Sequence, residues 1–394
     1  MAETFGELLR AHRLAAGLSM GQLAKLTHYS KGYLSKIEND LKPPTPTLAR
    51  LCDGVLDVGG RLVEAAACGG PALGRRQVLV VGTMLGVGAL AGNGARSVPD
   101  EQVIAGMRTS FEQLRELGLR TSPAVVLEPL KALHHTVHAL ARENAGVVGT
   151  RLLLLAARIA EYTGWMSQEA GDEQNAVWWT RQASELSRAA GDPDIASYAF
   201  VREAGIALYR QDAAGTISLA QQAQWIGRAG SRVLALAARR EAQGHALAGD
   251  RHATESAFGR AARLMACASP VGPYPALGTS APDPLELARG WALSDLGLNA
   301  EAAAVLDRQL TSVPAGSRRT RARFGVRRSL AHALSGEIEQ SCHTLADTLD
   351  DVAHIDSATV RADLRQLART LGRWHNHGAV REVYPDLKRL LAHR

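Results

Sequence analysis

The chain of 394 residues is too long for one ordinary hydrophobic core, so it contains two or more domains or an array of repeats. Its 46% hydrophobic and 21% charged residues are typical of a globular protein and exclude a disordered one. Basic residues number 45 against 39 acidic ones, and a net charge of +6 does not by itself indicate nucleic-acid binding.

The cysteines argue against a disulfide or zinc framework. All four are scattered without C-x-x-C spacing, at Cys52, Cys68, Cys267 and Cys342. This usage predicts a reduced, cytoplasmic protein. The first residues contain no apolar stretch that would direct secretion, which agrees with a cytoplasmic location.

A first helix is expected over residues 5–16, where apolar residues recur at helical spacing and Gly17 ends the pattern. The residues expected to face the core are Leu8, Leu9 and Leu14.

Two further helix starts lie close together in residues 19–40. Ser19 and Gln22 form a capping box, in which the hydroxyl accepts the Gln22 backbone N–H and the Gln side chain reaches back. Ser30 is the expected N-cap of a helix over residues 31–39. The three residues between the two helices suffice only for a tight turn, so the pattern predicts a helix-turn-helix.

The second of these helices has an apolar and a polar side. Leu34 and Ile37 are spaced to share a small core with Leu23 and Ala24. The residues left facing away from this core are Lys31, Gly32, Tyr33, Ser35 and Lys36. A helix that exposes cationic and hydrogen-bonding side chains suits the major groove of DNA.

This region resembles the xenobiotic-response-element family, the Cro and lambda-repressor type of helix-turn-helix, over roughly residues 5–67. The matching stretches are Leu18-Ser19, Gln22-Leu23-Ala24, Ser30, Tyr33-Leu34-Ser35-Lys36-Ile37-Glu38 and Pro44-Thr45-Pro46. The resemblance implies that Lys31, Gly32, Tyr33 and Lys36 touch a double-stranded DNA operator. The predicted DNA-binding set is completed by Gln22, Ser30 and Ser35. Met20 departs from the family, which often has a phosphate-contacting Gln there.

Two more helices are expected, over residues 47–56 after the cap Thr45 and over residues 61–67. Gly69-Gly70-Pro71 then marks a boundary. The expected organisation is a helix-turn-helix domain at residues 1–70, a linker at 71–100 and a helical repeat region at 101–394.

Residues 78–91 form an uncharged, glycine-rich apolar run behind Arg75-Arg76. The run is shorter than the about 20 apolar residues that a transmembrane helix needs. A helix packed on the repeat region is expected, because glycines permit close approach of backbones. Contact with a membrane and a flexible linker are the alternatives.

From residue 101 onward the helical pattern repeats. Two small residues recur twelve positions apart, on either side of a turn with Gly, Asp or Asn. The pairs are Gly164/Ala176, Ala204/Thr216, Ala242/Thr254, Gly290/Ala302 and Ser329/Ser341. The first residues of successive pairs are 40, 38, 48 and 39 positions apart, and the longest of these intervals contains the insert 269–284. Small residues let two helices cross closely, so each pair predicts a helical hairpin.

These hairpins resemble tetratricopeptide repeats, in a slightly long variety, over roughly residues 147–394. Residues 101–144 are expected to add one more hairpin. The predicted fold is therefore all-α: a lambda-repressor-like helix-turn-helix domain followed by a tetratricopeptide-like α-solenoid with a concave groove. A plain helical bundle is the alternative.

All six tryptophans lie in the repeat half. Tryptophan is a good anchor in a binding groove, so Trp178, Trp179 and Trp225 are candidates for binding an effector. For the six as a set, packing between hairpins is the favoured interpretation. Trp178 and Trp179 are adjacent on a helix and face different directions, so one of them is expected to be less buried.

Two histidines four apart, His134 and His138, could share a helix face and bind zinc, but no third ligand is evident. No phosphate loop, nucleophile elbow or carboxylate pair is found. We therefore expect no catalytic residue, metal or cofactor, and no enzymatic activity.

Together these features predict a cytoplasmic, sequence-specific DNA-binding transcriptional regulator. It is expected to act as a homodimer whose repeat region binds a peptide, small-molecule or protein effector. The resemblance implies an architecture like that of the peptide-sensing regulators of Gram-positive bacteria. The alternatives are an interaction scaffold whose helix-turn-helix no longer binds DNA, and a membrane-tethered regulator.

Overall fold

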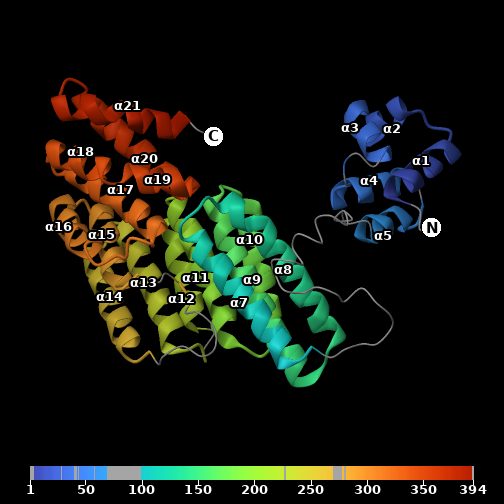
Figure 1. The fold of residues 1–394 in the computed structure, drawn as a ribbon, viewed down its shortest axis with the longest axis horizontal. Coiled ribbons are helices and arrows are strands. Elements are labelled where there is room, and N and C mark those ends of the chain that lie inside the picture. The colour runs from blue at the N-terminus through green and yellow to red at the C-terminus, as the bar shows by residue number, and fades with distance from the viewer. Residues whose placement is uncertain are drawn as a thin grey trace. The chain divides into compact units, whose positions relative to one another are not determined.

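The computed structural model describes residues 4–27, 29–39, 42, 44–56, 58–68, 99–225, 228–268, 277–278 and 281–392 (Figure 1). The chain divides into two compact units, Met1–Leu90 and Ala91–Arg394. The described residues of both units form helices joined by turns and contain no β-strand, so the predicted all-α fold is confirmed.

The described part of the N-terminal unit is a bundle of short helices. They are α1 Phe5–Ala15, α2 Met20–Thr27, α3 Lys31–Glu38, α4 Pro46–Leu56 and α5 Arg61–Cys68. Their apolar sides share one core, in which Leu9, Leu23, Leu34, Ile37 and Leu48 are fully buried. Burying each such side chain contributes about 1.5–3 kcal/mol. Helices this short are marginal alone, so their shared core stabilises them.

One core prediction for α1 is wrong. Leu14, expected to face inward, is 58% exposed. The buried stripe of α1 instead runs through Phe5, Leu9 and Arg13, at steps of four residues. Leu14 lies one position, or about 100°, further around the helix and so outside that stripe. The prediction failed because a charged residue occupies a position that apolar periodicity assigns to a hydrophobic one.

In the C-terminal unit each helix from α7 to α18 packs against the next, whereas α19 and α20 pack against α17, and α21 packs against α18 and α20 (Figure 1). The first are α7 Glu101–Gly118, α8 Pro123–Glu143, α9 Gly146–Glu169, α10 Glu173–Ala189, α11 Pro193–Tyr209, α12 Ala213–Trp225, α13 Ser231–Leu247 and α14 Arg251–Ala266. They are followed by α15 Pro284–Asp295, α16 Asn299–Leu310, α17 Arg318–Leu334, α18 Ile338–Ala346, α19 Leu349–Ile355, α20 Ala358–Leu371, the short 3₁₀ helix η1 Gly372–Trp374 and α21 Gly378–Ala392.

All five predicted hairpin turns are formed. Each begins with a residue of positive φ, at Gly171, Gln211, Gly249, Gly297 and Gly336. Glycine adopts this left-handed conformation without steric cost, which favours it at the end of a helix. The following helix is capped in three cases by the side chain of Asp172, Asp212 or Asp250. The expected extra hairpin over residues 101–144 is also present, as α7 and α8.

The small residues predicted to lie where hairpin helices cross are buried in all five pairs. A methyl group added to Gly164 would lie 3.2 Å from the Ala176 carbonyl oxygen. In α17 and α18 the two hydroxyls exchange hydrogen bonds across the crossing: Ser329 Oγ donates to the Ser341 carbonyl at 2.7 Å, and Ser341 Oγ to the Ser329 carbonyl at 2.8 Å. The structure therefore confirms the predicted close crossings.

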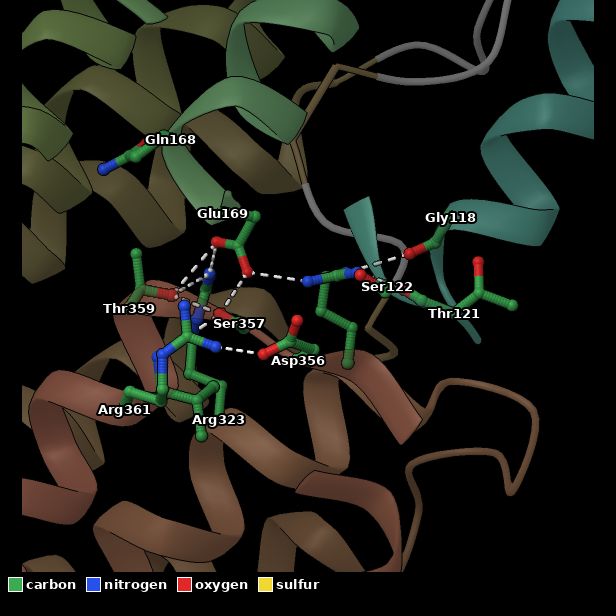
Figure 2. Close-up of polar contacts among 12 residues, drawn as sticks. Gly118, Thr121, Ser122, Gln168, Glu169, Arg323, Asp356, Ser357, Thr359 and Arg361 are labelled. Atoms are coloured by element: carbon green, nitrogen blue, oxygen red, sulfur yellow. Dashed lines mark hydrogen bonds and ion pairs between the residues drawn. The ribbon is translucent and has the colours of Figure 1, made fainter. Parts of the chain in front are cut away.

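A buried carboxylate at the end of α9 connects early and late helices of the repeat region (Figure 2). Glu169 has no exposed surface and accepts hydrogen bonds from Arg319 at 2.8 Å and from Ser357 at 2.6 Å. Thr359 and Arg323 also donate to its carboxylate. These residues come from α17, from α20 and from the residue before α20, so one carboxylate joins an early helix to two late ones.

Arg319 extends the same link to the segment after α7. Its Nε donates to the Gly118 carbonyl at 2.9 Å and its Nη2 to the Thr121 carbonyl at 2.6 Å. Its backbone N–H donates to the Leu119 carbonyl at 3.0 Å. The first hairpin is therefore attached directly to α17, and the hairpins form a closed turn instead of an open row.

Two predicted features cannot be compared with the structure. The apolar run 78–91 and most of the insert 269–284 lie outside the described residues. Within the residues that are described, no helix combines the length and apolar character needed to cross a membrane.

Candidate DNA-binding surface

Both helices of the predicted motif begin at the expected caps. The Ser19 backbone N–H donates to the Gln22 side chain at 2.8 Å, and the Gln22 N–H donates to the Ser19 hydroxyl at 3.3 Å. Ser30 accepts the Tyr33 backbone N–H at 3.2 Å. These caps satisfy N–H groups that the first turn of a helix leaves without partners, which fixes where α2 and α3 start.

Helix α3 separates a buried side from an exposed one, as the sequence predicts. Leu34, Ile37 and Glu38 are buried, whereas Lys31, Gly32 and Lys36 are exposed and Tyr33 and Ser35 are partly exposed. Gln22 and Ser30, the remaining members of the predicted set, are also exposed. A methyl group on Gly32 would meet no atom within 4 Å, so the backbone of α3 is open to a partner at this position.

Tyr33 is held in place on this surface. Its ring stacks on Tyr29 at a centroid distance of 5.3 Å and an interplanar angle of 19°. The Lys42 ammonium lies 4.7 Å from the centroid of the same ring. Stacking and cation–π contact each favour a fixed ring orientation. The half-exposed phenol therefore projects from α3 in a defined direction.

An ion pair that the sequence analysis missed lies beneath α3. Arg13 Nε and Nη2 donate to the two carboxylate oxygens of Glu38, at 2.5 and 3.0 Å. Arg13 Nη1 donates to the Leu18 carbonyl at 2.8 Å. Both side chains are buried. The signal was present in the sequence, since Arg13 follows Leu9 by four positions and Glu38 follows Leu34 by four.

This pair also decides the charge of the exposed side of α3. Glu38 is the one acidic residue of the helix, and it faces Arg13. Within the described residues, neither Lys31 nor Lys36 forms an ion pair with a carboxylate. The exposed side of α3 therefore carries cationic and neutral groups only, which suits the phosphate backbone and base edges of DNA.

Residues 4–66 match the family model of a helix-turn-helix domain. The chain carries such a domain at its N-terminal end. The matched segment includes the capped turn between α2 and α3 and all seven predicted DNA-binding residues. No curated protein matches the chain.

The three tryptophans predicted to bind an effector occupy different environments. Trp179 is 3% exposed and Trp178 is 49% exposed, with ring centroids 4.7 Å apart, so one of this adjacent pair is indeed less buried. Trp225, at the end of α12, is 88% exposed. These residues lie on α10 and α12, and no described contact joins Trp225 to the other two.

One histidine of the cluster on α8 is packed in the interior. His134 is 3% exposed, and its ring lies nearly perpendicular to that of Trp179, at an interplanar angle of 86° and a centroid distance of 4.9 Å. Burial, together with the charges of His135 and His138, lowers the pKa of His134 to about 3, so its imidazole is neutral at physiological pH. Across the described residues, no group of three His, Cys, Asp or Glu side chains is arranged to hold a metal ion.

Proposed function

We propose that the protein is a sequence-specific DNA-binding transcriptional regulator whose repeat region binds an effector. The observation that supports DNA binding most directly is the exposed side of α3, which offers Lys31 and Lys36 and carries no acidic residue of the helix itself. It belongs to a segment that matches helix-turn-helix domains. In a scaffold that has lost DNA binding, nothing would favour exposed lysines on one side of α3 and a buried Glu38 on the other.

In the proposed complex α3 lies in the major groove. Lys31, Gly32 and Tyr33, at its N-terminal end, approach base edges, as the first residues of a recognition helix do. Gln22 and Ser30 are at helix N-termini, where backbone N–H groups and short polar side chains bind phosphate oxygens. Lys36, one turn further along α3, adds a second cation for the adjacent phosphates or bases.

Replacing Lys31 and Lys36 by alanine is expected to weaken operator binding. The operator is first selected from random double-stranded DNA by the full-length protein. We expect each variant to bind it about tenfold more weakly. If a lysine contacts a phosphate, the slope of log K against log salt falls by about one; if it contacts a base, discrimination at one position is relaxed instead. Fluorescence anisotropy across a salt titration measures both quantities.

Lys388→Ala is the matched control, because it removes the same charge from an exposed position of α21 in the other unit. It should leave the affinity unchanged. Equal affinity of Lys31→Ala, Lys36→Ala and the control would contradict the assignment of α3. Failure of the wild type to select any DNA sequence would favour the scaffold alternative.

The regulator is expected to bind its operator as a homodimer. One domain of this type reads a single half-site, so two copies are normally needed for useful affinity, and two-fold symmetry is then imposed on the operator. The selected sequence should therefore contain an inverted repeat. Light scattering of the protein–DNA complex measures the stoichiometry, and a mass corresponding to one protein per duplex would rule the dimer out.

A further inference from the structure

The C-terminal unit contains a partly open cavity of about 90 Å³. This is several times the about 10–15 Å³ that a single water requires. Its walls come from α7, α9, α11, α13, α15 and α17, the first helix of each hairpin, and from residues 277–278. The second helices of the hairpins contribute nothing to its lining. The cavity is therefore the inner side of the closed turn of hairpins.

The lining of this cavity is strongly cationic. The arginines on α9, α11, α13 and α17 are Arg158, Arg202, Arg239, Arg240, Arg319 and Arg323, and Arg115 on α7 is a seventh. Among the lining residues that the structure describes, Glu161 is the one carboxylate, and it lies 3.8 Å from Arg202. Glu169, behind the wall, pairs with Arg319 and Arg323. Other nearby carboxylates are Asp192 and Asp194, which act on Arg158, and Asp363, which acts on Arg323.

Arg239 and Arg240 are the members of this set whose described partners are all neutral. Arg239 Nη1 donates to the Pro284 carbonyl at 3.4 Å, and Arg240 Nη1 donates to the Gln243 side chain at 2.8 Å. The Nε atom of each is buried and has no hydrogen-bond partner among the described residues, as is also true of Nε of Arg202 and of Arg323. A buried cation without a counter-charge is unfavourable by several kcal/mol, so such groups are normally paired.

The pKa values of Arg239 and Arg240 are lowered, as expected for buried guanidinium groups that have no acidic partner among the described residues. Burial, with the neighbouring Arg239 guanidinium, lowers the pKa of Arg240 to about 9. Burial also lowers the pKa of Arg239 to about 10. An anion placed between them would favour the charged form of both.

Aromatic rings complete the cavity wall. Trp165, Tyr198 and Trp291 are among its lining residues, and the tryptophans predicted from the sequence are not. A cavity that combines apolar rings with a few convergent polar groups is the usual form of a small-molecule site. Planar guanidinium groups bind carboxylate and phosphate oxygens through paired hydrogen bonds.

We propose that this cavity binds a small organic anion, whose phosphate or carboxylate oxygens contact Arg239 and Arg240 while its apolar part lies against the aromatic rings. Since this ligand would be the effector of the regulator, its regulatory role rests on the proposed function; its binding to the cavity does not. The small volume of the cavity favours a compact molecule over a peptide several residues long.

The binding test uses the full-length protein and isothermal titration calorimetry at constant ionic strength. The probes are inorganic diphosphate, phenyl phosphate and citrate, with potassium chloride and spermidine as controls. We expect saturable binding of one probe anion per chain and none of the controls. Preference for diphosphate or phenyl phosphate would assign a phosphate ligand, and preference for citrate a carboxylate one.

Arg239→Gln and Arg240→Gln should each weaken this binding by about tenfold or more, the value of a charge-assisted hydrogen bond. Arg308→Gln, which removes an exposed arginine from α16, is the matched control and should leave it unchanged. Hydrogen exchange on the wild type does not depend on the variants folding. The bound anion should slow exchange in α11 and α13 and leave α14 and α16 unaffected.

Absence of saturable binding by every probe, or equal affinity of the α13 variants and the control, would overturn the proposal. So would protection of α14 and α16 in place of α11 and α13. Operator binding is measured separately, so a protein that binds the anion and no DNA would retain this site and lose the proposed function. A protein that binds operator DNA and no anion would retain the proposed DNA-binding function and lose the proposed anion site.

Discussion

Replacing Glu169 by alanine should lower the stability of the C-terminal unit by about 3–5 kcal/mol, the usual effect of removing one partner of a buried ion pair. The variant would leave Arg319, which is 1% exposed, and Arg323 without their carboxylate. Urea unfolding followed by tryptophan fluorescence measures this directly, because all six tryptophans belong to this unit.

Glu116→Ala provides the control, since it removes an ion pair with Arg120 in which both side chains are more than half exposed. Such pairs contribute about 0–1 kcal/mol, so the control should unfold almost like the wild type. Similar losses in the two variants would show that Glu169 is not a structural link.

The stability that Glu169 contributes should decrease as the pH falls. Burial alone would raise the pKa of Glu169, but Arg323, Arg319 and the Ser357 hydroxyl lower it from its ordinary value of 4.5 to about 2. The folded state therefore favours the ionised form, and this stabilisation is complete above pH 4.5 and lost as the pH falls towards 2. The difference in stability between wild type and Glu169→Ala should shrink over that interval.

Glu38→Ala and Arg13→Ala should each destabilise the N-terminal unit by about 3 kcal/mol, because each leaves a buried charge without its partner. Hydrogen exchange of peptides from residues 4–66 should accelerate by about a hundredfold as a result. The tryptophan-detected unfolding of the repeat region should be unchanged, since no tryptophan precedes residue 165.

Arg10→Ala on the same helix separates this effect from the general loss of an arginine. Arg10 is exposed, whereas Arg13 is 8% exposed. Exposed substitutions usually change stability by less than about 0.5 kcal/mol. If Arg10→Ala and Arg13→Ala accelerate exchange equally, the buried pair does not stabilise the domain.

Local chemistry explains which parts of this fold could be predicted. A capping box acts within one turn of helix, so Ser19 and Gln22 mark the start of α2 wherever the rest of the chain lies. The small residues at hairpin crossings are equally local, because twelve positions and one turn bring Gly164 against Ala176. The Arg13–Glu38 and Glu169–Arg319 pairs join residues 25 and 150 positions apart. Helical spacing places Arg13 and Glu38 on the buried sides of their helices, but no local pattern shows which residues pair.

The cavity residues show a signal that was present in the sequence and not used. In the repeats, the residue after the first small residue lines the cavity at Trp165, Gln243 and Trp291. The residue two positions before the first small residue also lines the cavity, at Tyr162, Arg202 and Arg240. Aligning the repeats on their small residues would therefore have identified positions on the inner surface, including Arg202 and Arg240. The tryptophans chosen as candidates, Trp178, Trp179 and Trp225, instead lie on α10 and α12, the second helices of their hairpins.

The position of Glu169 also has a consequence for synthesis on the ribosome. Its partners Arg319 and Thr359 follow it by 150 and 190 residues. At about 5–20 residues per second, the carboxylate leaves the ribosome about 10–40 seconds before the last of them. Until Arg319 and Arg323 have been made, the Glu169 carboxylate lacks these two counter-charges and must stay in contact with water. The nascent chain can therefore form its early hairpins one by one, but it can close the turn only after nearly the whole protein has been made.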